Sequence, residues 1–130
     1  MTLEQKDLLL KDLCARMSYG VKIQSAEENI ITLTGIILPN HYSTINGVYS
    51  FDSYSMKPYL FPLSSMTEEQ QKEYDSIIYH NVELHWQRYY NVIDVDCYEE
   101  LHDFYHKNHL DYRGLIPMGL AIDATGKNIY

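Results

Sequence analysis

The chain has 130 residues, of which 45% are hydrophobic and 22% are charged, the size and composition of a single folded domain with a sizeable core. Its formal net charge is −8 and no basic stripe is present, which argues against nucleic acid or an anionic membrane surface as a partner. No apolar run approaches the roughly 20 residues that a membrane span requires, and no apolar signal segment opens the sequence. We therefore expect one domain over residues 1–130, with neither nucleic acid nor membrane as a partner.

The two cysteines, Cys14 and Cys97, are far apart in the sequence. Both fall on predicted apolar helical faces, so we expect buried, reduced thiols rather than a disulfide. Small secreted domains usually carry more cysteines at closer spacing, and the sequence therefore favours a cytoplasmic protein.

The first predicted element is a helix that ends near Gly20. Thr2 followed by Gln5 fits a capping box, in which each side chain satisfies a backbone N–H of the first turn. Placing the residues at ~100° intervals collects the apolar side chains into one stripe, which we expect to be buried. Its members are Leu3, Leu10, Leu13, Cys14 and Met17.

Strands are predicted next. Val21 and Ile23 alternate with polar residues, and the run from Ile30 to Leu38 is rich in β-branched side chains. The dipeptide Asn46-Gly47 favours a tight hairpin turn between two further short strands. We expect an antiparallel sheet of three to four strands.

The second half of the sequence predicts two further helices, which cover one face of the sheet. Pro58 and Pro62 predict an irregular, extended connector over residues 57–65. Thr67 and Gln70 form a second capping box, and another helix is expected from about Tyr98 to about His109. The tail, residues 110–130, is expected to be irregular or to hold short extended pieces, so the fold class is α+β.

The negative charge is concentrated between residues 67 and 103. Ten acidic residues lie there: Glu68, Glu69, Glu73, Asp75, Glu83, Asp94, Asp96, Glu99, Glu100 and Asp103. Only Lys72 and Arg88 oppose them, so this segment alone carries −8 and the remainder of the chain is neutral. A basic protein partner would be attracted to such a surface.

Aromatic residues lie among these acids, and tyrosine supplies 13 of the chain's 17 aromatic side chains. A face that includes Trp86, Tyr89, Tyr90 and Glu99 could bind a partner without enzymatic activity. The alternative is a solvated helical face that only maintains solubility.

A second hypothesis is a metal site. His102, His106 and His109 fall within a ~60° arc of the predicted third helix, next to Glu99, and imidazoles on adjacent turns can share Zn²⁺. The glutamate of an H-E-x-x-H motif is absent, and histidines beside an apolar face are often half-buried without a ligand. The acids around Asp94 and Asp96 lack the regular ligand spacing of a calcium loop, which favours solvated acids there.

Nucleophilic catalysis finds no support in the sequence. There is no G-x-S-x-G motif, no glycine-rich phosphate loop and no C-x-x-C pair. We expect no cofactor and no enzymatic activity. An unrecognised hydrolase stays open as an alternative, because acid–base pairs are identified by geometry rather than by spacing.

Three blocks of sequence carry a resemblance: residues 8–21, which include Leu8-Leu9-Leu10-Lys11-Asp12-Leu13-Cys14; residues 57–69, which begin Lys57-Pro58-Tyr59; and residues 110–121, which include Tyr112-Arg113-Gly114. Together they resemble a family of small uncharacterised proteins from gut Bacteroides-type bacteria and their phages. Members often carry arginine at the position of Phe61. The resemblance implies a bacterial or phage cytoplasmic origin and favours an accessory or interaction protein, and it supplies no known activity.

Arg113 is one of few charged residues in the tail. We expect its guanidinium to hold the tail in place by pairing with an acid of the negative segment. Alternatively, Tyr112 and Arg113, together with Lys57 and Tyr59, mark a contact site.

Overall fold

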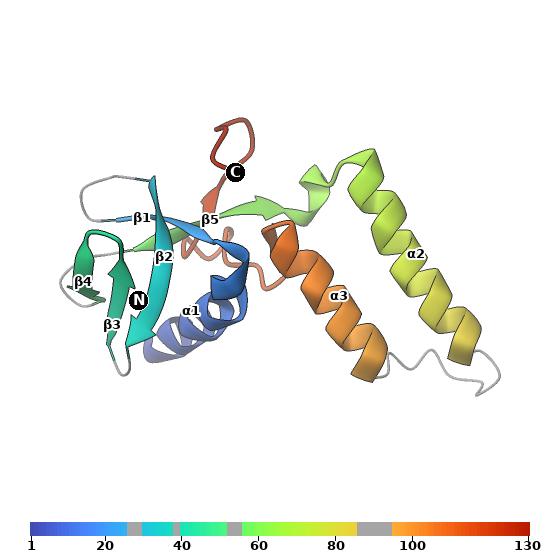
Figure 1. Cartoon of the computed structure of the whole chain (residues 1–130), viewed down its shortest axis with the longest axis horizontal. Coiled ribbons are helices and arrows are strands. Elements are labelled where there is room, and N and C mark those ends of the chain that lie inside the picture. The colour runs from blue at the N-terminus through green and yellow to red at the C-terminus, as the bar shows by residue number, and fades with distance from the viewer. Residues whose placement is uncertain (26–29, 38–39, 52–55, 86–94) are drawn as a thin grey trace.

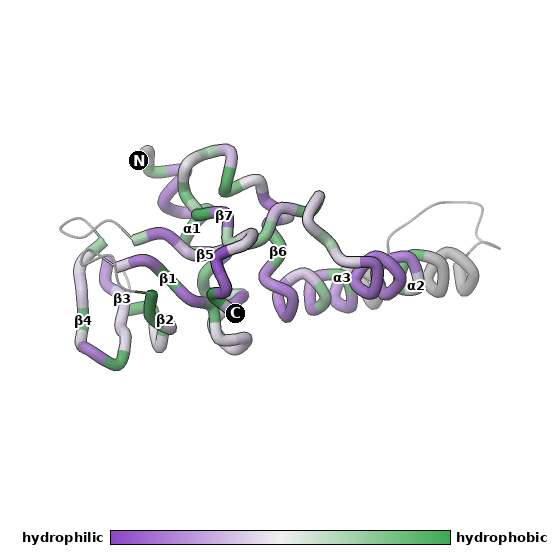
Figure 2. Tube along the Cα trace, turned by 90° about the horizontal axis from the view of Figure 1, so that it is seen from above, coloured by the Kyte–Doolittle hydropathy of each residue, from purple (hydrophilic) through white to green (hydrophobic). Residues whose placement is uncertain are grey.

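The structure, a computed structural model, describes residues 1–25, 30–37, 40–51, 56–85 and 95–130, with the backbone alone for 79–85 and 95–97. A sheet with α1 (Leu3–Arg16) forms the body of the molecule, and α2 (Glu68–His85) and α3 (Val95–Lys107) form an antiparallel helical hairpin that extends away from it (Figure 1). Figure 2 shows the same separation from above. The α+β class is confirmed, but the expectation that the two later helices cover a face of the sheet is wrong.

Helix α1 begins as the sequence predicts and buries a different face. The side chain of Thr2 accepts a hydrogen bond from Gln5 N (3.1 Å), and Gln5 Oε1 accepts one from Thr2 N (2.9 Å). The buried face consists of Leu9, Asp12, Leu13 and Arg16. The predicted buried stripe is wrong at Leu3 and Cys14, because Leu3 is 75% exposed and Cys14 is exposed as a free thiol. Two charged residues lie inside instead, since they neutralise each other.

The described strands form one seven-stranded sheet in the order β4-β3-β2-β1-β5-β6, with β7 also paired to β5. The strands are β1 (Lys22–Gln24), β2 (Ile30–Ile37), β3 (His41–Thr44), β4 (Gly47–Ser50), β5 (Lys57–Pro62), β6 (Leu110–Asp111) and β7 (Ile122–Asp123). Pairings from β4 through to β5 are antiparallel, as expected, whereas β6 and β7 run parallel to β5. The sheet is therefore mixed and larger than the three to four antiparallel strands predicted.

The hairpin between β3 and β4 forms as Asn46-Gly47 predicts. Tyr42 pairs with Tyr49, and Thr44 pairs with Gly47, which has φ 143°. The Thr44 hydroxyl also accepts a hydrogen bond from Asn46 N (3.1 Å). Gly47 closes the turn as the first residue of β4, because it tolerates positive φ without steric cost.

Residues 57–62 form a strand instead of the irregular connector expected from the two prolines. Pro58 pairs with Ile23 of β1, and Pro62 is the last residue of β5. The backbone N–H of Phe61, which lies between the two prolines in the strand, donates a hydrogen bond to His109 O (2.8 Å). A strand tolerates proline where the missing N–H is not needed for pairing, and this allows both prolines here.

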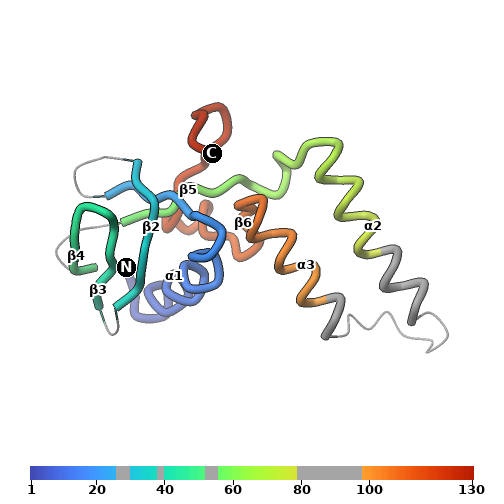
Figure 3. Tube along the Cα trace, in the orientation of Figure 1, coloured from blue at the N-terminus to red at the C-terminus, as the bar shows by residue number. Residues whose placement is uncertain are grey.

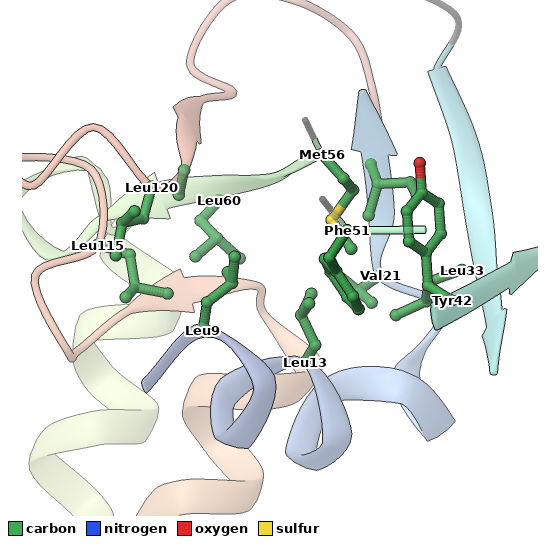
Figure 4. Close-up of a cluster of buried hydrophobic side chains, with 12 residues drawn as sticks. Leu9, Leu13, Val21, Leu33, Tyr42, Phe51, Met56, Leu60, Leu115 and Leu120 are labelled. Atoms are coloured by element: carbon green, nitrogen blue, oxygen red, sulfur yellow. The ribbon is translucent and has the colours of Figure 1, made fainter. Parts of the chain in front are cut away.

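The main core lies between α1 and the sheet. Figure 4 shows Leu9 and Leu13 of α1 facing Leu60 and Tyr42 of the sheet and Val21, which directly precedes β1. The tail contributes Leu115 and Leu120 to this core, and a separate cluster of Tyr59, Ala124 and Ile129 packs nearer the C-terminus. The tail is consequently part of the folded body, and Figure 3 shows the red end of the trace beside β5.

Candidate functional site

A shallow groove of about 410 Å³ lies between α2 and α3. Three carboxylates line it, those of Glu73, Glu100 and Asp103, together with the ammonium of Lys107. Among the described residues of the lining, three acids oppose one base, which gives a net charge of −2 when all are ionised. Ile77 and Phe104, 7% and 1% exposed, close its bottom, so an acidic rim surrounds an apolar floor.

An apolar cluster holds the two helices together beneath the groove. Ile77, Leu101, Phe104 and Leu110 are buried in this cluster, and the Tyr74 ring packs against that of Phe104 with 6.1 Å between centroids. The start of α2 is also joined to the end of α3, because Gln70 Nε2 donates to Asn108 Oδ1 (3.2 Å). Lys107 Nζ forms an ion pair with Glu73 across the groove.

Helix α2 begins at the second predicted capping box. Gln70 N donates to Thr67 Oγ1 (3.1 Å) and Thr67 N donates to Gln70 Oε1 (3.0 Å). Glu68 and Glu69 occupy the first turn, where the positive end of the helix favours acids.

The predicted acidic face is only partly gathered into the groove. Of the ten acids, the side chains of Glu83, Asp94 and Asp96 lie outside the described residues. Glu73, Glu100 and Asp103 line the groove. The remaining four, Glu68, Glu69, Asp75 and Glu99, are exposed on the two helices but are not part of its lining.

Aromatic rings cover a second face of α3. Tyr98 is 54% exposed and its ring lies 3.8 Å from that of His102, measured between centroids. Tyr105 and Tyr112 stack at 4.8 Å. Burial raises the pKa of Tyr105 to about 12 and lowers that of His102, so both side chains stay neutral near pH 7. Trp86, Tyr89 and Tyr90, predicted to belong to a binding face, lie outside the described residues.

Tyr112 and Arg113 join the tail to α3 and α1 through a chain of polar contacts. Arg113 Nη2 donates to the Tyr112 hydroxyl (2.8 Å), and the same hydroxyl lies 2.8 Å from His106 Nε2. Because arginine can only donate, the Tyr112 oxygen accepts from Arg113. That oxygen can also accept a second hydrogen bond, so the direction of its contact with His106 Nε2 is set by the histidine tautomer. Burial, with the positive charge of Arg16 nearby, lowers the pKa of His106 to about 4.

The carboxylate that pairs with Arg113 is not in the negative segment. Arg113 Nε donates to Asp12 Oδ1 (3.0 Å), and Arg16 Nε donates to Asp12 Oδ2 (2.7 Å). Both Asp12 and Arg16 are fully buried, and Arg16 Nη2 also donates to Leu110 O (2.5 Å). Arg113 therefore clamps the tail as predicted, but to α1 and not to an acid of residues 67–103. We call Asp12, Arg16, Arg113, Tyr112 and His106 the buried polar network.

The three histidines proposed as metal ligands do not converge. His102 and His106 are neighbours on α3, with 5.9 Å between ring centroids. Helix α3 ends at Lys107, before the predicted boundary, and His109 adopts φ 55°. Its ring stacks on Tyr130 at 3.6 Å, away from the other two. Among the side chains that the structure describes, no group of three or more His, Cys, Asp or Glu is arranged to hold a metal ion.

The sequence offered an unused signal for the buried network. Leu9, Asp12, Leu13 and Arg16 follow helical spacing, and an acid four residues before a base can pair on one helix face. The pair Asp12–Arg16 could have been recognised there. The role of Lys107 opposite Glu73 depends on how α2 meets α3, which no local pattern indicates.

Comparison with known proteins gives no guidance on identity, since no family model, no curated protein and no solved structure matches the chain. Among the described residues, no helix has the length and apolar character needed to cross a membrane.

Proposed function

We propose that the protein is a small, non-enzymatic interaction module whose α2–α3 groove binds a basic, partly apolar segment of another protein. The observation that carries the proposal is the groove itself, where Glu73, Glu100 and Asp103 surround Ile77 and Phe104. A cationic side chain would pair with the rim while an apolar one would reach the floor. The chain's net charge of −8 would speed the encounter with such a segment at low salt.

One feature supports a contact surface at this place over a merely solvated face. The acidic rim spans two helices, because Glu73 lies on α2 whereas Glu100 and Asp103 lie on α3. The predicted partner class, a basic protein, fits this surface.

The alternative hypotheses, a hydrolase and a metal site, have less support in this region. Among the described residues that line the groove there is no histidine, so they do not provide the histidine–carboxylate cleft of a hydrolase. His102 and His106 face the aromatic rings and the tail, and no third ligand accompanies them in the described structure.

The test uses a synthetic helical peptide that carries lysine and leucine on one face, with binding followed by fluorescence anisotropy. The double variant Glu100→Gln/Asp103→Asn removes two rim charges, and we expect it to weaken binding by about tenfold. The matched control is Glu68→Gln/Asp75→Asn, which removes the same charge from outside the groove and should change affinity by less than about twofold.

Two further peptides separate the contributions of charge and apolar contact. Replacing the lysines with glutamate should abolish binding, and replacing the leucines with serine should weaken it. If both double variants lower affinity equally, the attraction is a diffuse field effect and the groove is not the site. Absence of any binding at low salt would refute the proposal.

A further inference from the structure

A second hollow, of about 400 Å³, lies in the body of the molecule, beside the start of α1. Its lining shares no residue with the acidic groove, so it stands apart from the proposed function. We propose that this hollow binds a small amphipathic anion, an alkyl carboxylate such as a medium-chain fatty acid.

The walls of the hollow are apolar and adaptable. Leu9 of α1, Phe51 after β4 and Leu120 of the tail form its inner side. Three of the chain's five methionines, at positions 1, 56 and 118, also line it. Methionine side chains are flexible and polarisable, and they are favoured at surfaces that accept apolar ligands of varied shape. The volume lies within the range of small-molecule pockets, about 300–1,000 Å³.

The sign of the ligand's charge is inferred from Lys57, the one charged side chain among the described residues of the lining. Lys57, at the start of β5, has an exposed side chain. The same hollow borders the first turns of α1 through Gln5, so the positive end of the helix is near, and Glu4 of that turn is not part of the lining. An anionic head group would thus meet a cation at the mouth while its chain contacts the walls.

The tail leaves room on the remaining side. Gly119 lines the hollow with φ 76°, and a Cβ built on it would meet no atom within 4 Å. Met118, next to it, is 43% exposed and can be exchanged for a larger side chain without disturbing the buried core. It therefore offers a way to block the hollow.

The experiment is an NMR titration of the full chain, labelled with ¹³C in the methionine methyl groups, with octanoate as the probe. We expect the signals of Met1, Met56 and Met118 to shift with saturation, whereas those of Met17 and Met66, which lie outside the lining, stay in place. Octanol should bind more weakly, and octylammonium more weakly still, because of Lys57.

Two variants complete the test. Lys57→Gln should weaken octanoate binding by up to about fivefold and leave octanol unaffected, with Lys72→Gln on α2 as the matched control. Met118→Trp should abolish the shifts by filling the hollow.

The proposal is overturned if octanoate moves none of the three signals, if all five shift alike, or if Lys57→Gln and Lys72→Gln behave the same. Because none of these residues belongs to the acidic groove, failure here leaves the peptide-binding proposal unaffected.

Discussion

Replacing Asp12 by asparagine tests the buried polar network most directly. The Asp12 side chain is fully buried, and its two oxygens accept from Arg16 Nε (2.7 Å) and Arg113 Nε (3.0 Å). Asparagine has nearly the same shape but no charge, and its NH₂ group would face one of the two guanidinium donors. Arg16, itself 0% exposed, would then be a buried cation without a counter-charge.

Breaking a buried ion pair by removing one partner costs about 3–5 kcal/mol, since the remaining charge stays desolvated. Arg113 is 16% exposed and can recover part of its hydration, so its share of the loss is smaller. We therefore expect Asp12→Asn to lower the free energy of unfolding by about 3 kcal/mol. That is a large part of the 5–15 kcal/mol typical of a domain.

The measurement is urea denaturation at pH 7, in which a lower midpoint at an unchanged slope reports a loss of stability. The matched control is Asp7→Asn, which removes an exposed carboxylate from the same helix and should change stability by less than about 0.5 kcal/mol. A loss below about 1 kcal/mol in Asp12→Asn would show that the carboxylate is not balancing two buried cations, and the reasoning would be refuted.

Two further predictions concern protonation and thiol chemistry. Burial lowers the pKa of His106 to about 4, below its ordinary value near 6.5, so unfolding takes up a proton between these values, and stability should fall as the pH drops from about 6.5 to 4. His106→Gln should reduce that pH dependence in urea titrations. Cys14 is exposed, so iodoacetamide should alkylate it in the native protein; peptide mass spectrometry that finds Cys14 unmodified until denaturant is added would contradict its exposure.

Elements with local signals were predicted well from the sequence. Both capping boxes form, at Thr2 with Gln5 and at Thr67 with Gln70, because cap and partner are only three residues apart. The turn before Gly47 forms for the same reason. These contacts depend on a few consecutive residues, and tertiary packing does not have to supply them.

Elements created by distant partners were anticipated only coarsely, as short extended pieces of the tail with no assigned strand or partner. Strands β6 and β7 have two residues each, and they exist because β5 offers them backbone groups to pair with. The end of α3 was placed two residues too late, at His109, where the left-handed backbone turns the ring toward Tyr130. The metal hypothesis failed to gain support for that reason: a short error in the helix boundary removes the third ligand from the arc.

The candidate site was anticipated as a concentration of charge, and its geometry was not. A count of acids between residues 67 and 103 cannot distinguish Glu73 and Glu100, which line the groove, from Glu68 and Asp75, which do not. The distinction depends on which side of α2 meets α3. Arg113 was expected to pair with that charge, but the buried Asp12 is the nearer and less hydrated partner.

Asp103 connects the groove to the body of the molecule, and this affects how binding data are interpreted. Its Oδ1 accepts a hydrogen bond from the Tyr19 hydroxyl (3.0 Å), and that bond raises the pKa of Tyr19. Asp103→Asn therefore changes a rim charge and a contact between α3 and the turn after α1. The variant Tyr19→Phe removes only the contact. If Tyr19→Phe binds the basic peptide like the unaltered protein while Glu100→Gln/Asp103→Asn does not, then the lost affinity belongs to the charge of the groove and not to a reorientation of the helical hairpin.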